Sequence, residues 1–300
     1  MDTSILILGT GALATLFAAR LASAGAQVTL LGSWLEAVQA LNTHGVRLIG
    51  LDGKEQVASV RATDNASECR QASLALVLVK AWQTERAAGL LEDCLSADSL
   101  AVTLQNGLGN RETLARTIGP QRVAIGVTTM GATLLGPGIV RVGGEGTISL
   151  EAHPRIGPLE ESLRLAGFEV SVVEDAISLL WGKLVINAAI NPLTALVQVP
   201  NGELLQRPSL LQLMIDLATE VAVVARAYGI ALPFDDPAEA AMRIAQRTAL
   251  NRSSMLQDVL RGAPTEIDAI CGEVVRLGEA KGVPTPVNRA MWSLVRGLRD

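Results

Sequence analysis

The feature that most constrains the fold of this chain is a glycine-rich turn near the N-terminus. Ser4–Leu8 is an apolar run, typical of a buried parallel strand, and it leads directly into Gly9-Thr10-Gly11-Ala12-Leu13-Ala14. Ala12–Ala24 then repeats apolar residues at helical spacing, and Gly25 is a typical stop signal. This order predicts a loop that binds the phosphates of a dinucleotide on backbone N–H groups at the helix start. An ordinary strand-to-helix turn is the alternative.

The residues after the second predicted strand bear on which dinucleotide is bound. In NAD sites an Asp or Glu about 20 residues after the glycines binds the ribose 2′-hydroxyl. Here Gln27–Leu31 runs into Gly32-Ser33-Trp34, and Glu36 comes slightly late. There is no Arg at this point to hold a 2′-phosphate, and Ser33 offers a hydrogen bond without a charge. The sequence therefore leans towards NADPH and leaves NADH open.

Composition narrows the class of protein. The 300 residues are 49% hydrophobic, which allows one large or two ordinary domains and excludes intrinsic disorder. A net charge of −5 provides no basic surface for nucleic acid. No uncharged apolar run reaches the roughly 18 residues of a membrane helix, and no basic signal region opens the chain, so we expect a cytoplasmic protein. Three scattered cysteines and two histidines without a shared motif argue against disulfides and a metal site.

The pattern of elements predicts an α/β half followed by a helical half. Further strands are expected at Leu74–Val79, Leu100–Leu104, Val123–Val127 and Glu169–Val173, with Ile139–Val142 and Thr147–Leu150 forming a hairpin. Strands separated by helices indicate βαβ units and a parallel sheet. From Ala176 onward the helical period dominates, over Ile177–Ala189, Leu210–Tyr228, Pro237–Arg247 and Glu266–Lys281.

We therefore predict two domains, residues 1–174 and residues 175–300. The first is a parallel-sheet domain that binds the dinucleotide, and the second is all-helical. Chains with this organisation commonly hold a ligand in a cleft between the two domains. The apolar helical half fits a homodimer interface as well as interior packing.

Two strands of the predicted sheet end in polar residues. Leu74–Val79 leads into Lys80, and Leu100–Leu104 leads into Gln105-Asn106-Gly107. Ligands of open α/β sheets bind beyond the carboxyl ends of the strands, so Lys80 and Asn106 are candidate contacts to cofactor or substrate. A solvated lysine and a plain Asn-Gly turn are the alternatives.

A polar stripe marks the first helix of the second half. Lys183, Asn187 and Asn191 follow at spacings of four residues, which places them on one face of an otherwise apolar helix. Burying such groups costs free energy unless they find partners, so the stripe is either a ligand site or a structural hydrogen-bond seam. Pro192 is expected to kink or end this helix.

Polar residues near the C-terminal end add further candidates. Ser254, within Ser253-Ser254-Met255-Leu256-Gln257-Asp258, has a hydroxyl suited to a carboxylate. Glu266 is expected in the first turn of a helix that starts at Pro264 or Thr265, where it would also offset the helix dipole.

At this point the chain resembles the 2-dehydropantoate 2-reductase (ketopantoate reductase) family, and the matching segments occur in family order across nearly the whole chain. In the first half they are Gly9-Thr10-Gly11-Ala12-Leu13, Lys80-Ala81-Trp82-Gln83, Asn106-Gly107-Leu108-Gly109 and Gly126-Val127-Thr128-Thr129. In the second half they are Trp181-Gly182-Lys183-Leu184 through Asn187, Asn191-Pro192-Leu193-Thr194-Ala195, Pro200-Asn201-Gly202-Glu203-Leu204, Ser253-Ser254-Met255-Leu256-Gln257-Asp258 and Thr265-Glu266-Ile267-Asp268.

The resemblance implies a Rossmann domain, a helical domain and NADPH-dependent reduction of 2-dehydropantoate to pantoate. By position, Lys183 matches the family's proton donor. Glu266 matches a group near both substrate and cofactor and is the second catalytic candidate, which would orient the substrate hydroxyl or Lys183 itself. The residues that match substrate contacts are Asn106, Asn187, Asn191, Asn201 and Ser254. Those that match or adjoin cofactor groups are Gly9, Thr10, Gly11, Ala12, Leu13, Ala14, Ser33, Lys80, Asn106, Ala132 and Glu266. The family often has Arg where this chain has Ser33.

The chemistry expected of Lys183 follows from its surroundings. Hydride attack on a C2 ketone places negative charge on the carbonyl oxygen, and a proton donor at that oxygen stabilises the transition state. A lysine in an apolar cleft is expected to have a lowered pKa, which suits a general acid. A reductase of another 2-oxo acid and a non-catalytic dinucleotide sensor remain alternatives, although a sensor would not need the polar stripe.

Overall fold

The computed structural model describes residues 4–70 and 72–298. By its internal contacts the chain forms two units, here called unit 1 (Met1–Gln105 and Asn110–Ala176) and unit 2 (Asn106–Gly109 and Ile177–Asp300). The boundary predicted after residue 174 lies two residues before the one between the units, and the short Asn106–Gly109 segment groups with the helical half, which the sequence does not predict.

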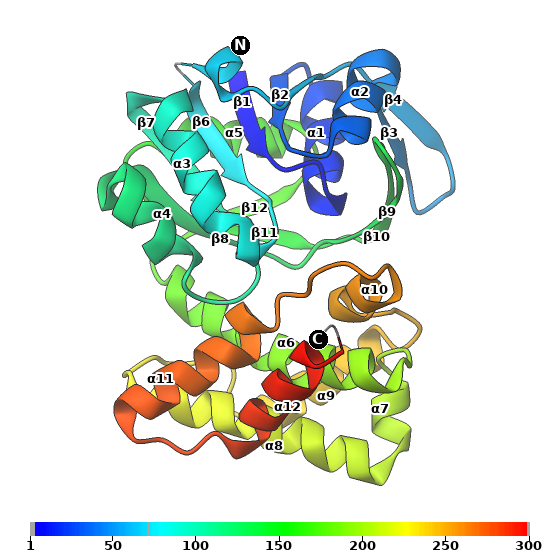
Figure 1. The fold of residues 1–300 in the computed structure, drawn as a ribbon, viewed down its shortest axis with the longest axis vertical. Helices are drawn as coiled ribbons and strands as arrows, with labels where there is room; N and C mark the ends of the chain where they lie inside the picture. The colour runs from blue at the N-terminus through cyan, green and yellow to red at the C-terminus, as the bar shows by residue number, and fades with distance from the viewer. Residues whose placement is uncertain (1–3, 71, 299–300) are drawn as a thin grey trace. The chain divides into compact units, whose positions relative to one another are not determined.

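Unit 1 is built on an eight-stranded sheet with the order β12-β11-β8-β7-β6-β1-β2-β5 (Figure 1). Neighbouring strands pair in parallel except β11 with β8, which are antiparallel. The strands are β1 (Ser4–Leu8), β2 (Gln27–Leu31), β5 (Arg61–Thr63), β6 (Ala72–Val77), β7 (Leu95–Thr103), β8 (Val123–Thr128), β11 (Thr147–Glu151) and β12 (Glu169–Val173). The predicted parallel sheet is confirmed.

The strand order reverses at β1, which has β2 on one side and β6 on the other. This is the arrangement of a Rossmann-type sheet, whose ligands bind beyond the carboxyl ends of the strands at that switch point. The glycine loop after β1 and the residues after β6 therefore share the ligand-binding edge of the sheet.

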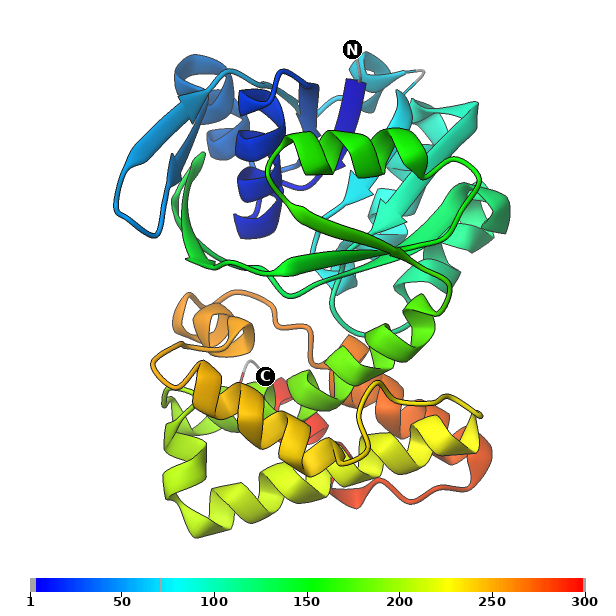
Figure 2. The same ribbon diagram turned by 180° about the vertical axis from the view of Figure 1, so that it is seen from behind.

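Helices cover both faces of this sheet. Figure 2 shows α1 (Ala12–Ser23) and α5 (Gly157–Leu165) on one face. On the other face lie α3 (Thr84–Cys94) and α4 (Asn110–Ile118). Side chains of β1 alternate between the two layers: Ile5 and Ile7 pack with α1 and α5, whereas Leu6 and Leu8 pack with α3 and α4. Because helices cover both faces of the sheet, side chains on both sides of β1 are buried, and its sequence is a continuous apolar run.

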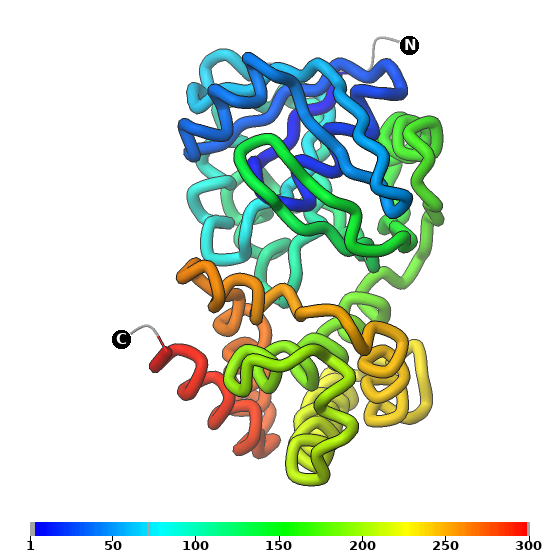
Figure 3. The backbone as a smooth tube through the Cα atoms, turned by 90° about the vertical axis from the view of Figure 1, so that its right-hand side faces the viewer, coloured from blue at the N-terminus to red at the C-terminus, as the bar shows by residue number. Residues whose placement is uncertain are grey.

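A smaller four-stranded sheet with the order β4-β3-β10-β9 completes the strands of unit 1. It consists of β3 (Val46–Ile49), β4 (Glu55–Ala58), β9 (Gly131–Gly136) and β10 (Ile139–Gly144), and Figure 3 shows the long hairpin of β9 and β10. The helix α2 (Leu35–His44) connects β2 to this sheet.

The predicted hairpin of Ile139–Val142 with Thr147–Leu150 is wrong. β10 pairs with β9 and β3, and β11 joins the large sheet beside β8. The turn signal Gly136-Pro137-Gly138 closes the β9–β10 hairpin instead. Gly146, between β10 and β11, lets the chain pass closely from one sheet to the other: a Cβ there would lie 2.6 Å from the Thr129 backbone.

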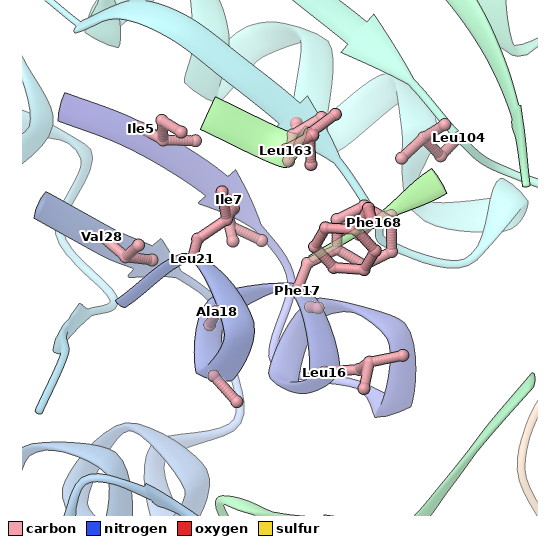
Figure 4. Close-up of a cluster of buried hydrophobic side chains, with 14 of the residues drawn as sticks. Ile5, Ile7, Leu16, Phe17, Ala18, Leu21, Val28, Leu104, Leu163 and Phe168 are labelled. Carbon is pink, nitrogen blue, oxygen red and sulfur yellow. The ribbon is translucent and has the colours of Figure 1, made fainter. Parts of the chain in front are cut away.

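The core of unit 1 is closed by aromatic packing between helix and strand segments that are far apart in sequence. Phe17 of α1 stacks on Phe168, just before β12, with ring centroids 4.6 Å apart (Figure 4). Phe17 is fully buried among Ile5, Ile7 and Leu163. The three cysteines, Cys69, Cys94 and Cys271, are buried free thiols, as the sequence indicated.

Unit 2 is helical. Its elements are α6 (Ala176–Val197), α7 (Glu203–Gln206), α8 (Pro208–Ala227), α9 (Pro237–Arg247), α10 (Ser254–Leu260), a π-helical turn (Asp268–Gly272), α11 (Glu273–Lys281) and α12 (Pro286–Arg296). The helix α8 contacts α7, α9, α11 and α12. By length and composition alone α6 and α8 could cross a membrane (mean hydropathy 1.3 and 1.4), yet both supply side chains to the buried core of this unit.

Two local predictions for unit 2 need correction. The helix α6 does not end at Pro192 but continues to Val197, although a proline inside a helix removes one hydrogen bond and costs about 3 kcal/mol. Burial of Leu193 and Ala195 outweighs that cost, and the Thr194 hydroxyl bonds the carbonyls of Ile190 and Asn191. Glu266 lies before the π-helical turn, so it does not occupy the first turn of a helix.

Candidate functional site

The glycine loop of unit 1 has a geometry that only glycine at its first position permits. Gly9 has φ +117°, and a Cβ there would lie 3.2 Å from the backbone of Leu78 and Val79 after β6. Around Gly11 there is open space: an added Cβ would meet nothing within 4 Å. The helix α1 starts at this point without a side-chain cap, so its first N–H groups are available to an anion.

The other residues predicted to bind the cofactor lie around this loop at different depths. Thr10 is buried, and its methyl group would lie 2.7 Å from a Cβ placed on Gly32, so the loops after β1 and β2 touch. Ser33 is exposed directly after that contact. Ala12 and Leu13 are half-buried, whereas Ala14 is fully buried in the core and serves close helix–strand packing.

The segment from the end of β2 into the first turn of α2 carries an acidic side chain and no basic one. The Trp34 indole N–H donates to the Glu36 carboxylate at 3.4 Å, and both residues are exposed. Between Gly32 and Val38 the sequence has neither Lys nor Arg. This loop offers hydrogen bonds to a ribose and supplies no cation for a 2′-phosphate.

Buried polar contacts fix the ends of β6 and β7. The Gln105 amide donates to the Val79 carbonyl at 3.0 Å and to the Thr84 hydroxyl at 2.8 Å. The Thr103 hydroxyl donates to the Gln105 oxygen at 2.9 Å. These contacts hold the strand ends from which Lys80, half-buried, and Asn106 follow. The remaining cofactor candidate in unit 1, Ala132, lies half-buried in β9 of the small sheet.

In unit 2 the Asn106 segment packs directly on the residues that precede and form the π-helical turn. The Asn106 side-chain amide donates to the Glu266 carboxylate at 3.0 Å, and the Leu108 N–H donates to the Ala269 carbonyl at 2.9 Å. Gly107, with φ +79°, lies against that carbonyl so closely that any side chain would collide with it. Asn106 and Glu266, two candidate site residues that are 160 positions apart in the sequence, thus form a hydrogen-bonded pair.

Glu266 also acts on the lysine of the polar stripe. Desolvation lowers the pKa of Lys183 from its usual 10.5 to about 8, and the nearby Glu266 carboxylate opposes that change by favouring the ammonium. The lowered pKa expected from the sequence is confirmed. Glu266 itself is 6% exposed. An ammonium near its point of titration beside a buried carboxylate is suited to donating a proton near neutral pH.

The two asparagines of the stripe have amides that no protein group satisfies. Asn191 is 5% exposed and Asn187 is half-buried. Among the residues that the structure describes, neither side-chain amide has a hydrogen-bond partner. Amides without a protein partner are free to bond water or a ligand.

A second set of contacts brings the remaining candidates towards the C-terminal half of α6. The hydroxyls of Thr194 and Ser253 lie 2.7 Å apart, and Ser253 caps α10, whose first residue is the exposed Ser254. The Asn201 N–H donates to the Asn251 carbonyl at 3.0 Å. Residues 251–253 therefore contact both Asn201 and the helix α6, and they lead directly into Ser254.

Sequence reasoning missed the residues that hold these candidates in place. Gln105, Thr194, Ser253 and Thr248 are buried or half-buried hydroxyls and amides whose partners are distant in sequence. For Gln105, Thr194 and Ser253 the one available signal was their position within or beside the matching segments, whereas Thr248 lies outside them. No group of three His, Cys, Asp or Glu side chains that could hold a metal occurs in residues 4–70 and 72–298.

Comparison with known proteins identifies the family. The family model "Ketopantoate reductase PanE/ApbA" matches residues 5–155, and "Ketopantoate reductase PanE/ApbA C terminal" matches residues 175–299. The chain belongs to the ketopantoate reductase family. It is 38% identical to the 2-dehydropantoate 2-reductase of Archaeoglobus fulgidus, over 98% of this chain and 97% of that one. It is 32% identical to that of Pyrococcus horikoshii, over 97% and 96%.

Solved structures agree with this assignment. A PanE/ApbA family ketopantoate reductase from Ralstonia eutropha superposes with a TM-score of 0.92 at 36% identity, covering 99% of this chain and 98% of that one. D-mandelate dehydrogenase in complex with NADH and anilino(oxo)acetate superposes with a TM-score of 0.93 at 26% identity, with the same coverage. The open space at Gly11 and the uncapped start of α1 fit the pyrophosphate of such a dinucleotide.

Proposed function

We propose that this chain catalyses the NADPH-dependent reduction of 2-dehydropantoate to pantoate, a step towards pantothenate and coenzyme A. Family membership over nearly the full length supports this activity. The observation that carries the proposal is Lys183, whose ammonium loses solvation on a helix face with two unpartnered amides and faces the Glu266 carboxylate. A sensor without catalysis has no use for this arrangement.

Lys183 acts as the proton donor in this proposal. When bound, the reduced nicotinamide cofactor supplies a hydride to C2 of the 2-oxo acid. The Lys183 ammonium donates a hydrogen bond to the C2 oxygen and then transfers its proton there, which stabilises the developing alkoxide. With a pKa of about 8, Lys183 is mostly protonated at neutral pH and gives up its proton readily.

The other residues of unit 2 orient the substrate and Lys183. Glu266 keeps the amine charged until the proton is transferred, and its bond to Asn106 fixes the direction of the carboxylate. Asn187, Asn191 and Ser254 have donors for the substrate carboxylate, and Asn201 is a further substrate contact.

In unit 1 the backbone binds the cofactor. We assign the pyrophosphate to the loop from Gly9 to Ala14 and the adenosine ribose to Ser33. Lys80, Asn106, Ala132 and Glu266 complete the cofactor contacts. The resemblance to ketopantoate reductases implies NADPH, whereas the mandelate dehydrogenase neighbour was solved with NADH. Since the loop after β2 has no cation, we propose that NADH also supports turnover.

A second candidate substrate class is favoured by one structural neighbour. D-mandelate dehydrogenase matches this fold closely and was solved with anilino(oxo)acetate, itself a 2-oxo acid derivative. A reductase of another 2-oxo acid would use the same lysine and amides. In either case the protein acts on a small-molecule 2-oxo acid, and we propose that it does so in the cytoplasm as a homodimer.

The test is a substrate panel. The purified chain is mixed with NADPH, or with NADH in parallel, and the absorbance of the reduced nicotinamide is followed at about 340 nm. Ketopantoate is expected to give the highest kcat/KM, and phenylglyoxylate, the 2-oxo acid of mandelate, a much lower one. Reversal of that order would move the assignment to the second candidate, and no oxidation with any 2-oxo acid would favour a sensor.

A further inference from the structure

Trp292 of α12 contacts both ends of the π-helical turn that follows Glu266. Its indole N–H donates to the carboxylate of Asp268, the first residue of the turn, at 2.7 Å. At the last residue, Gly272, an added Cβ would lie 3.0 Å from the same indole nitrogen. The missing side chain of Gly272 therefore lets the indole lie directly on the turn, and one side chain of α12 spans it from end to end.

The hydrogen bonding of this turn sets the direction of the residues before it. The Gly272 N–H donates to the Ile267 carbonyl at 3.0 Å, five residues earlier, whereas an α-helix bonds four residues earlier. Bonding of this kind is rare and occurs mostly as single turns inside helices, often at functional sites. If the turn rewound as an α-helix continuous with α11, the residues before it would rotate by about 100° about the helix axis. Glu266 would then face another direction.

The segment that contains Asn106 contacts the turn as well. The Asn106 amide donates to the Glu266 carboxylate at 3.0 Å, and the Leu108 N–H donates to the Ala269 carbonyl at 2.9 Å. Both bonds fit the direction that Glu266 has in the π-helical arrangement. The Trp292 contacts fix the first and last residues of the turn, so the arrangement depends on both sets of contacts.

The charged groups around the turn act on different partners. In α12 the Arg296 guanidinium lies over the Trp292 ring at 5.7 Å, and its Nε is 3.9 Å from the Asp268 carboxylate. In α11 the side chains of Glu273 and Arg276 form an ion pair. The carboxylate that favours the charged form of Lys183 is that of Glu266. A change at Asp268 is therefore expected to reach Lys183 through the position of Glu266.

We propose that the Asp268–Trp292 contact positions Glu266: it holds the π-helical turn and thereby keeps the Glu266 carboxylate beside Asn106 and facing Lys183. Asp268 and Trp292 are positioning residues, because they act through Glu266 and not on the reacting atoms. Their value to catalysis rests on the proposed function, whereas their effect on Lys183 can be measured without turnover.

The experiment follows the titration of Lys183. The chain has four lysines, so NMR with ¹³C-labelled lysine resolves the Lys183 signal, and its absence in Lys183→Met assigns it. Asp268→Ala removes the acceptor and keeps the indole. Once Glu266 turns away, the ammonium loses stabilisation, and the titration midpoint should move down by about 0.5–1 pH unit. Above that midpoint kcat/KM for ketopantoate should fall about 3–10-fold, with little change at about pH 6.

Three variants separate positioning from a general loss of structure. Asp268→Asn keeps an acceptor for the indole N–H and should restore the wild-type midpoint. Tyr228→Phe removes a hydrogen bond that another aromatic side chain donates to α11, at the Leu277 carbonyl and 3.3 Å long, and should leave the midpoint unchanged. In Glu266→Gln the midpoint is already lowered, so adding Asp268→Ala should lower it no further.

An unchanged Lys183 midpoint in Asp268→Ala would overturn the inference. An equal decrease in Asp268→Asn would also overturn it, since the charge and not the contact would then matter, as would an equal decrease in Tyr228→Phe. A further decrease in the double variant would mean that Asp268 acts without Glu266.

Should Asp268→Ala not fold, Trp292→Phe removes the N–H, keeps an aromatic ring and should lower the midpoint in the same way. If the wild type oxidises no NADPH with ketopantoate while the midpoints change as expected, the proposed function fails and the positioning of Glu266 stands.

Discussion

The two units build their sites in different ways. In unit 1 the proposed cofactor site is made of backbone: a glycine with φ +117°, an open glycine and the first N–H groups of α1. In unit 2 the site is made of side chains from segments far apart in the sequence, with Asn106, Lys183 and Glu266 in one cluster and Asn201, Thr248 and Ser253 around another.

Because of this difference, the two sites are sensitive to different kinds of substitution. A backbone site depends on conformation and free space, so it is damaged by adding atoms. A side-chain site depends on charge and hydrogen bonds, so it is damaged by removing them.

The largest effect is expected in unit 2, from removal of the amine. Lys183→Ala should lower kcat about 10²–10⁴-fold, the usual loss for a general acid, because no other group takes over the proton. Binding of NADPH should persist, since its backbone site lies in unit 1. Steady-state kinetics and fluorescence titration with NADPH measure the two quantities. A variant that turns over as fast as the wild type would refute the role of Lys183.

In unit 1, adding atoms at Gly11 is expected to have the next largest effect. Gly11→Val is expected to leave the fold intact, because a Cβ at this position meets nothing within 4 Å, and to fill the space over the start of α1. The Kd for NADPH should rise about 10–100-fold, as for the loss of one or two charge-assisted hydrogen bonds.

Gly9→Ala is the matched variant for this prediction. Its strained φ and its contact with Leu78 and Val79 should lower the free energy of unfolding by about 1–3 kcal/mol, which Gly11→Val should not do. Calorimetry measures both variants. Unchanged NADPH binding in Gly11→Val would place the pyrophosphate elsewhere.

A smaller effect is expected on stability when the lysine charge is removed. Folding lowers the pKa of Lys183 from 10.5 to about 8, so below pH 8 the folded state carries a poorly solvated ammonium. Lys183→Met should therefore raise the free energy of unfolding at pH 7 by about 1–3 kcal/mol, because each tenfold change in proton affinity corresponds to about 1.4 kcal/mol.

The free-energy penalty of the desolvated Lys183 ammonium depends on pH. In the wild type this penalty should disappear as pH rises from 8 to above 10.5, where the amine is neutral in both states. The gain from Lys183→Met should shrink over the same range in urea titrations. A variant less stable than the wild type at pH 7 would contradict the desolvated ammonium.

The smallest effect is a shift of the pH profile. For reduction, kcat/KM should fall as pH rises through about 8, where Lys183 loses its proton. Glu266→Gln removes the charge that raises the Lys183 pKa and keeps an acceptor for Asn106, so this fall should move to lower pH. A profile that stays in place or moves to higher pH would show that Glu266 does not act on the lysine.

Much of unit 1 was predictable because its signals are local. The strand Ser4–Leu8, the glycine turn and the helix that follows are adjacent in sequence, and each limits the conformation of the next. The hairpin after residue 136 was misassigned because strand pairing is not local: β10 had two possible neighbours, and only the whole sheet decides between them.

The candidate site in unit 2 was predictable only in part. Helical spacing placed Lys183, Asn187 and Asn191 on one face, but it could not show that the amides lack partners. The pairing of Asn106 with Glu266 and of Asn201 with Thr248 depends on tertiary packing, which no spacing rule conveys. At Pro192 the local rule failed because buried neighbours outweighed its cost.

The central claim is that the Lys183 amine meets the oxygen that receives the hydride's charge. A crystal structure of the wild-type chain with NADP⁺ and pantoate tests it most directly. We predict Lys183 Nζ within hydrogen-bond distance, about 2.6–3.2 Å, of the C2 oxygen of pantoate. An amine well beyond contact with bound pantoate, with another donor at that oxygen, would contradict it.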